Sequence, residues 1–204
     1  SARSHRSAEP LEFDYEFEEL EASVQEHQAY QARLEVFADS GAWQQALQLL
    51  ADMKGSRLVP SVLTYNACIK ACNKGSQWQQ ALQILAEMQV CGLEPDIISY
   101  DASISACGLS LQWHQAMQIL VEMQGHGFVP SIGAYNASMI ACEKCGQWQQ
   151  ALQLLTDMKG HKLTLRPFSY DVTISACAKG GGWQEALHLL AEMRSGGLAP
   201  HAKT

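Results

Sequence analysis

Residues 78–88, Trp78-Gln-Gln-Ala-Leu-Gln-Ile-Leu-Ala-Glu-Met88, decide the fold of this chain. Trp78, Ala81, Leu82 and Leu85 stand at i, i+3, i+4 and i+7, and Met88 follows three residues later. This spacing is typical of one apolar face of an α-helix, with the glutamines and the glutamate left for solvent. The stretch therefore predicts an amphipathic helix whose apolar face must be covered by another part of the chain.

Residues of several types recur with this stretch at a constant interval of 35 residues, without insertion. An uninterrupted period in this range is the sequence signature of a repeat architecture. We expect the tryptophans, methionines and leucines to form the core. The recurring residues are Trp43, Trp78, Trp113, Trp148 and Trp183; Tyr30, Tyr65, Tyr100, Tyr135 and Tyr170; Met53, Met88, Met123, Met158 and Met193; and Cys72, Cys107, Cys142 and Cys177.

A second helix precedes the first one in each unit. Tyr65, Cys68, Ile69 and Cys72 share one helical face, and the turn-forming residues 73–76 separate this helix from the one that begins near Trp78. One such hairpin cannot bury its apolar face alone, so neighbouring units must stack on it. The sequence predicts an all-α fold, an α-solenoid of helix-turn-helix repeats.

The period divides the chain into a leader, five units and a short remainder. The units span residues 27–61, 62–96, 97–131, 132–166 and 167–201, and residues 202–204 align with the start of a further repeat, which we interpret as a truncation or a continuation. Residues 1–26 contain eight acids and two bases, with apolar residues between them. This leader is expected to be a capping helix for the first repeat or a docking segment for a basic partner.

The overall composition excludes few functions. The formal net charge is -7, but the leader carries most of it, and the remaining units hold 13 acids and 12 bases. A nearly neutral array imposes no strong sign on its partner. The seven cysteines show no disulfide-scaffold spacing, which favours reduced thiols. No apolar stretch has the length of a membrane-spanning helix, so no membrane insertion is expected.

Three further features make the chain resemble the pentatricopeptide repeat family. They are the Tyr-Asn or Tyr-Asp pair near the start of units 62–96 to 167–201, the Ala-Leu-x-Leu/Ile-Leu-x-x-Met run of the second helix, and Gly-Leu-x-Pro-Asp at residues 92–96. The tetratricopeptide repeat has a 34-residue period and a different aromatic pattern. The resemblance implies a right-handed superhelix whose first helices line a groove for single-stranded RNA, with one base per repeat.

In this family the residue after the tyrosine and the last residue of the unit read the base. Among the corresponding pairs, Asn66 with Asp96 resembles a pairing that reads uracil. Asn66 offers both a donor and an acceptor, whereas an ionised aspartate only accepts. The implied pairs are Gln31 with Ser61, Asn66 with Asp96, Asp101 with Ser131, Asn136 with Arg166, and Asp171 with His201.

The family also places an apolar side chain two residues before the tyrosine, where it wedges between bases, and a lysine near phosphate at the end of the first helix. Leu63, Ile98 and Phe168 fit the wedge position, whereas Gln28 and Gly133 do not. The phosphate position is occupied by Lys74, Lys144 and Lys179, and by Asp39 and Leu109 in the other two units. As an RNA reader the array looks partly degenerate.

No motif in the chain predicts catalysis. Nucleophile elbows, phosphate-binding loops and the zinc deaminase signature are missing, so we expect no enzyme activity, no cofactor and no small-molecule substrate. Cys142 and Cys145 have the spacing of half a zinc site, but no second Cys or His pair complements them. The scattered histidines are interpreted as solvated.

Two functional hypotheses follow. The first is a non-catalytic adaptor that binds single-stranded RNA and, by family resemblance, serves RNA processing, stability, editing or translation in a mitochondrion or plastid. The alternative is a protein-protein interaction scaffold in a large ribonucleoprotein or organellar assembly. The degenerate base-reading positions and the acidic leader favour this alternative.

Overall fold

The computed structural model describes residues 12–56 and 58–199, with side chains from residue 24 onward, so His201 lies outside the described residues. This part of the chain contains helices and no strand, and none of its helices is long and apolar enough to cross a membrane. The helices are α1 (Glu12–Ser40), α2 (Trp43–Gly55), α3 (Val62–Lys74), α4 (Trp78–Val90), α5 (Ile97–Leu109), α6 (Trp113–Gly125), α7 (Ile132–Lys144), α8 (Trp148–Gly160), α9 (Pro167–Gly180) and α10 (Trp183–Ser195).

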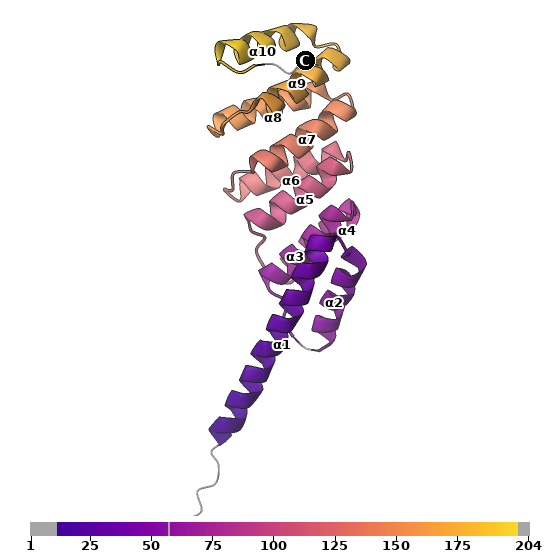
Figure 1. Ribbon diagram of the computed structural model, residues 1–204, viewed down its shortest axis with the longest axis vertical. Coiled ribbons are helices and arrows are strands. Elements are labelled where there is room, and N and C mark those ends of the chain that lie inside the picture. Colours follow the sequence, from indigo (N-terminus) through magenta and orange to yellow (C-terminus); the bar gives the residue numbers. More distant parts are fainter. Residues whose placement is uncertain (1–11, 57, 200–204) are drawn as a thin grey trace, which may run out of the picture.

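The helices form two layers, which makes the molecule an α-solenoid as expected (Figure 1). We call the odd-numbered helices the A helices and the even-numbered helices the B helices. Each A helix packs on the next A helix and on the B helix that follows it in the chain. Among the described residues, no Cα atoms of successive B helices lie within 8 Å of each other. The backbones of the A layer are therefore in continuous contact, whereas successive B helices stand farther apart.

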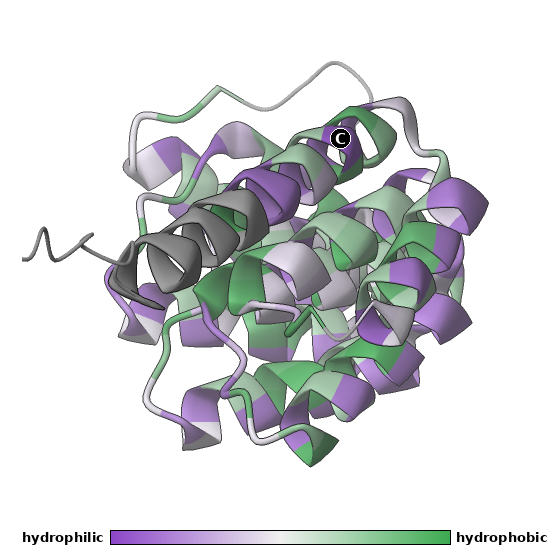
Figure 2. Ribbon diagram, turned by 90° about the horizontal axis from the view of Figure 1, so that it is seen from below, coloured by the Kyte–Doolittle hydropathy of each residue, from purple (hydrophilic) through white to green (hydrophobic). Residues whose placement is uncertain are grey.

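The apolar residues lie between the two layers, as the view along the stack shows (Figure 2). The methionines of the repeat are at most 1% exposed, and Tyr65, Tyr100 and Tyr135 are equally buried, which confirms the predicted helical faces. The prediction for the tryptophans is only partly correct. The first four are half-buried and pack at the edge of the core, but Trp183 is 62% exposed.

For Trp43 and Trp148, the end of the next A helix and the turn that follows it cover the indole. Trp43 lies against Gly75, and Trp148 lies against Gly180 at the end of α9 and against Gly182 in the turn before α10. A methyl group on any of these glycines would collide with the indole. Because α10 is the last described helix, no described turn lies over Trp183.

Small residues allow the A helices to approach closely. Gly108 is buried where α5 crosses α7, and a Cβ atom built on it would lie 2.6 Å from the carbonyl carbon of Ala137. Real Cβ atoms do not come so close to a backbone carbon, so the two helices would have to separate. Ala106, Ala141 and Ala176 are likewise buried. The spacing of the A layer thus depends on these short side chains.

Helix α1 joins the leader to the first repeat. It runs from Glu12 to Ser40 and crosses the expected boundary after residue 26 without a break. Its N-terminal part extends beyond the rest of the stack, while its C-terminal part packs on α2 and α3 (Figure 1). The acidic segment is therefore helical from Glu12 onward and continuous with the first A helix.

Candidate nucleic-acid interface

One polar side chain on each A helix follows the repeat tyrosine, and on the first four A helices it lies next to the start of the following A helix. We call these five side chains the groove column. The first four of them hydrogen-bond to residues of the next unit or at its boundary, so the column links successive units. Its members are Gln31, Asn66, Asp101, Asn136 and Asp171.

Asn66 is the most enclosed member of the groove column, with 6% of its surface exposed. Its amide nitrogen donates to both carboxylate oxygens of Asp96, at 3.0 and 3.2 Å. Its carbonyl oxygen accepts a hydrogen bond of 2.5 Å from the hydroxyl of Ser99, which also contacts Asp96 at 3.0 Å. The structure thus brings the predicted pair Asn66 and Asp96 together, and both ends of the Asn66 amide have partners within the protein.

Gln31, Asp101 and Asn136 make fewer hydrogen bonds than Asn66 and are half-buried. The Gln31 carbonyl accepts from the Thr64 hydroxyl at 3.5 Å, and the Asn136 carbonyl accepts from the Ser169 hydroxyl at 3.0 Å. Asp101 accepts from the backbone N–H of Ser131 at 3.2 Å. The Asn136 carbonyl and one oxygen of Asp101 are thus occupied, which leaves the Asn136 amide nitrogen and the second Asp101 oxygen better placed than Asn66 to contact a ligand.

The last residue of each unit stands at the N-cap of the next A helix. The side chains of Ser61, Asp96 and Ser131 accept from the backbone N–H three residues later, which satisfies a donor that the helix itself leaves free. Arg166 occupies the same place before α9 but makes no capping bond, since its side chain has no acceptor. Three of the positions expected to read bases therefore also stabilise helix ends.

The wedge positions are exposed although they are apolar. Leu63, Ile98 and Phe168 are 62%, 58% and 45% exposed, and all three stand in the first turn of an A helix, three residues before the groove column. Exposed single apolar residues are common, but recurrence at one register of a repeat indicates a surface property of the array. The A face therefore combines hydrogen-bonding groups with apolar side chains that are free to contact a flat partner.

Two acids neutralise the lysines expected near phosphate. The Asp39 carboxylate lies 2.7 Å from the Lys70 ammonium and 3.6 Å from the Lys74 ammonium. The Lys74 nitrogen also donates to the backbone carbonyl of Asp39 at 2.8 Å. Its hydrogen bond to Lys70 and the charges of both lysines lower the pKa of the Asp39 carboxyl. Because Asp39 and its lysines are exposed, a phosphate could displace this carboxylate at little cost.

Glu143 is the second neutralising acid, and it is 9% exposed. It binds the ammonium of Lys179, accepts from the Ser175 hydroxyl at 2.9 Å, and lies 3.4 Å from Lys144. Burial raises the pKa of this carboxyl, but the hydrogen bonds from Lys179 and Ser175 and the charges of Lys179 and Lys144 outweigh it, so the net shift is downward. Sequence reasoning missed Glu143, because its four counterparts Ala38, Asn73, Gly108 and Ala178 are uncharged.

A second column, at the tyrosine hydroxyls, was also missed. Tyr65, Tyr100 and Tyr170 donate to Glu87, Glu122 and Glu192 at 3.0, 3.1 and 2.9 Å, and Lys54, Gln89 and Lys159 of the preceding unit bind the same three carboxylates. We call this the tyrosine column. Burial, together with the adjacent carboxylates, raises the pKa of Tyr100 and Tyr170 to about 12, so these hydroxyls stay protonated donors. The acids recur every 35 residues, a signal that could have predicted the contact.

The buried thiols are not suited to chemistry. Burial raises the pKa of Cys68, Cys107 and Cys142 to about 12, so they remain protonated, and a protonated thiol is neither a nucleophile nor a metal ligand. Among the described residues no group of three His, Cys, Asp or Glu side chains could hold a metal ion. The A face therefore offers a partner hydrogen-bonding groups, apolar side chains and exposed ion pairs.

Comparison with protein families matches nearly the whole repeat array. A model described as the PPR repeat family matches residues 60–109, a pentatricopeptide repeat domain model matches residues 23–75, and a PPR repeat model matches residues 98–128, 134–163 and 168–198. Comparison with curated protein sequences gives no significant match.

Several solved structures have a fold similar to that of this chain. The pentatricopeptide repeat protein PPR10, in complex with an 18-nt psaJ RNA element, superposes with a TM-score of 0.63 at 23% identity over 85% of this chain and 29% of that one. The PPR domain of Arabidopsis thaliana protein-only RNase P 1, in complex with tRNA, gives a TM-score of 0.75 at 13% identity, covering 84% of this chain and 91% of that domain. In a further structure of PPR10, from maize, this chain covers 25% of the length.

Proposed function

Because the chain belongs to the pentatricopeptide repeat family, we propose that it is a non-catalytic adaptor that binds single-stranded RNA along the face of its A helices. The recurrence of exposed apolar side chains at Leu63, Ile98 and Phe168, beside the polar groove column, carries this proposal. An apolar side chain at this register can insert between successive bases, while the adjacent polar group faces a base edge. The two RNA complexes of similar fold support the same ligand class.

Reading of single bases is proposed to be uneven along the array. Asn136 and Asp101 keep hydrogen-bonding groups free for a base, whereas Asn66 must exchange its bond with Asp96 or Ser99 to make a new one. That exchange costs part of the binding energy that a direct contact would give. We therefore expect affinity to depend weakly on base identity, with any preference for uracil at the second repeat being modest.

The cellular role follows only from the family. We propose that the protein acts in RNA processing, stability, editing or translation in a mitochondrion or plastid, as part of a larger assembly. Five repeats contact about five bases, at one base per repeat, which is too short a site to be rare. Further repeats or partner proteins would supply the remaining specificity.

A second candidate, a protein-binding scaffold, is favoured by the neutralised lysines. Lys74, Lys144 and Lys179 all have carboxylate partners, so these three positions lack the unpaired cations that usually attract a phosphate backbone. If RNA affinity comes mainly from apolar and polar contacts, this surface also suits a polypeptide. The two candidates differ in their response to salt.

A fluorescence anisotropy titration tests the proposal. A labelled random single-stranded RNA, about four times as long as the site of one base per repeat, is titrated with the protein at several salt concentrations, and with the Lys74→Ala and Asn66→Ala variants. We expect saturable binding that weakens with salt, a slope reduced by about 0.7 in Lys74→Ala, and a small loss in Asn66→Ala. Binding no stronger than that of an unrelated acidic protein would reject RNA and favour the scaffold.

A further inference from the structure

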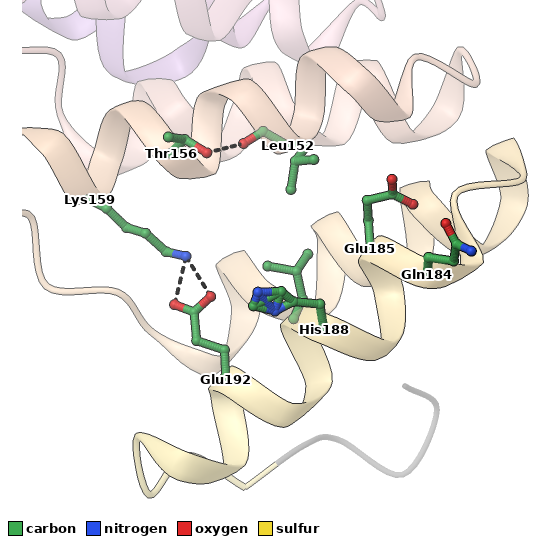
Figure 3. Close-up of a pocket in the computed structure, with 8 residues that line it drawn as sticks. Leu152, Thr156, Lys159, Gln184, Glu185, His188 and Glu192 are labelled. Carbon is green, nitrogen blue, oxygen red and sulfur yellow. Dashed lines mark hydrogen bonds and ion pairs between the residues drawn. The ribbon is translucent and has the colours of Figure 1, made fainter.

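The B face of the molecule, remote from the A face, contains grooves between successive B helices. They arise because the backbones of successive A helices lie close together, whereas successive B helices stand farther apart and meet only through side chains such as Lys159 and Glu192. The groove between α4 and α6 encloses about 160 Å³, and the groove between α8 and α10 encloses about 400 Å³. The larger groove combines an apolar floor with charged residues at both ends (Figure 3).

One end of the α8–α10 groove is closed by an ion pair. Lys159 of α8 lies 2.6 Å from Glu192 of α10, whose carboxylate also accepts from the Tyr170 hydroxyl at 2.9 Å. These contacts compensate the charge of Glu192, and they belong to the tyrosine column. Leu152 of α8 and Leu189 of α10 add apolar side chains to the lining of the groove.

The other end holds a carboxylate without a counter-charge. Glu185 lines the groove from α10 and makes neither a hydrogen bond nor an ion pair with the described residues. Its side chain lies at the end opposite to Glu192, with the His188 imidazole between them (Figure 3). Because Lys159 compensates the charge of Glu192, Glu185 is the carboxylate of this groove that has no ion-pair partner among the described residues.

The repeat itself shows that this carboxylate is a departure. The positions of Glu185 and His188 are occupied by glutamine in all four other units, at residues 45, 80, 115 and 150 and at residues 48, 83, 118 and 153. The α4–α6 groove has Gln115 and Gln118 at these places. Both grooves have the same framework of helices, but the one carboxylate of the α4–α6 groove, Glu122, is bound by Gln89 and Tyr100. Of these two grooves, only the one between α8 and α10 has a lining carboxylate without a hydrogen-bond partner among the described residues.

We propose that the α8–α10 groove is a docking site for an arginine side chain of a partner protein. A guanidinium offers paired N–H donors that match the Glu185 carboxylate, and it can stack flat on the His188 ring. The aliphatic stem of the arginine covers Leu152 and Leu189. The cavity is far larger than a metal ion needs, and no described group of three side chains could hold one. The proposal does not depend on RNA binding.

Titration by NMR tests the site directly. Amide spectra of the ¹⁵N-labelled protein are recorded with the peptide acetyl-Gly-Leu-Arg-Leu-Gly-amide and with the same peptide carrying citrulline in place of arginine. Citrulline keeps the shape but loses the charge. We expect shift changes confined to α8 and α10, and a Kd at least about tenfold higher both for citrulline and for Glu185→Gln, a loss typical of a charge-assisted hydrogen bond.

Two controls separate the site from general effects. Glu94→Gln makes the same change of net charge at an exposed residue outside the groove and should leave the Kd unchanged. N-acetyl-arginine methylamide, which lacks the flanking residues, should bind at least about tenfold more weakly than the peptide, because a partner protein supplies contacts beyond the side chain. Equal binding of the arginine and citrulline peptides, an unchanged Kd in Glu185→Gln, or equal binding of the small amide would overturn the proposal.

Discussion

The tyrosine column and the groove column recur at the same 35-residue step, yet they differ in how strictly they repeat. In the tyrosine column three units have the same tyrosine–glutamate contact, at 2.9 to 3.1 Å, each completed by a lysine or glutamine of the unit before. In the groove column a glutamine, two asparagines and two aspartates occupy one position, and their hydrogen-bond partners differ. We infer that the first column maintains the stacking of units and that the second is available for recognition.

The fourth unit shows how the tyrosine column tolerates a change. Asp157 replaces glutamate there, and its shorter side chain is bound by Gln153 of the same helix at 2.8 Å. The Tyr135 hydroxyl instead accepts from the Gln124 amide at 3.1 Å. A contact between neighbouring units is thus retained with a different donor.

The largest effect is expected where the A helices touch. Gly108→Ala places a methyl group 2.6 Å from the Ala137 backbone, so α5 and α7 must move apart. Overpacking costs about 1–3 kcal/mol, and the higher helix propensity of alanine returns at most about 1 kcal/mol. We expect a lower Tm in thermal denaturation followed by circular dichroism.

Gly125→Ala is the matched control, because this helical glycine has no atom within 4 Å of the added methyl group. It should leave the Tm unchanged or raise it slightly. If both variants behave alike, the close approach of α5 and α7 does not determine the spacing of the A layer.

A smaller effect distinguishes the two columns directly. Tyr100→Phe removes the hydroxyl that donates to Glu122 in a partly buried contact, and it should cost about 1 kcal/mol, because Gln89 still binds that carboxylate. Asp101→Ala removes a groove-column bond to the backbone of the exposed residue Ser131, which water can replace, so it should cost under about 0.5 kcal/mol. Urea denaturation of both variants measures the difference, and equal losses would remove the distinction between the columns.

Much of the fold could be predicted from the sequence, because the spacing of apolar residues within one unit defines its helices and this spacing recurs in five units. The spacing of Trp78, Leu82 and Met88 determines which face is buried, and the same reasoning holds in every unit. The burial of Trp183 was wrongly predicted, because the turn that covers a tryptophan comes from the following unit. A helical pattern within one unit contains no information about that neighbour.

The positions of the candidate site residues could be chosen from the sequence, but the hydrogen bonds that these residues make with one another could not. Family resemblance indicated Asn66 and Asp96, and the structure shows them bonded to each other, with Asp96 also capping α5. Glu143 could not be found from periodicity, since its counterparts are uncharged. Pairings between units depend on side-chain reach across the A layer, which the sequence does not specify.

A pH titration examines the acid on the A face. The Glu143 pKa is lowered from 4.5, so its ion pairs contribute stability above pH 4.5, and this contribution is lost as the pH falls through the folded-state pKa. Glu143→Gln should therefore show a smaller loss of stability on acidification below pH 4.5, and at neutral pH it should be less stable by no more than about 1 kcal/mol. If urea denaturation shows the same loss of stability below pH 4.5 in both proteins, Glu143 does not contribute to the pH dependence of stability.

The smallest expected effect is a gain in RNA affinity. Asp39→Asn removes the carboxylate that neutralises Lys70 and Lys74, which should raise affinity for single-stranded RNA about two- to fivefold at low salt, because a phosphate no longer has to displace that carboxylate. Asp52→Asn makes the same charge change on a B helix and serves as the control. If both variants gain equally, net charge rather than the A face explains the gain.

The most direct test of RNA binding along the A face compares two triple variants in an equilibrium binding assay with single-stranded RNA. One replaces Leu63, Ile98 and Phe168 by alanine; the other replaces Val59, Val90 and Val121, which are at least as exposed but lie outside the wedge register. Removing the stacking of one base should cost about 1–3 kcal/mol, so we predict a Kd at least about a hundredfold higher for the first variant and an unchanged Kd for the second. Equal affinities for the two variants would contradict binding along the A helices.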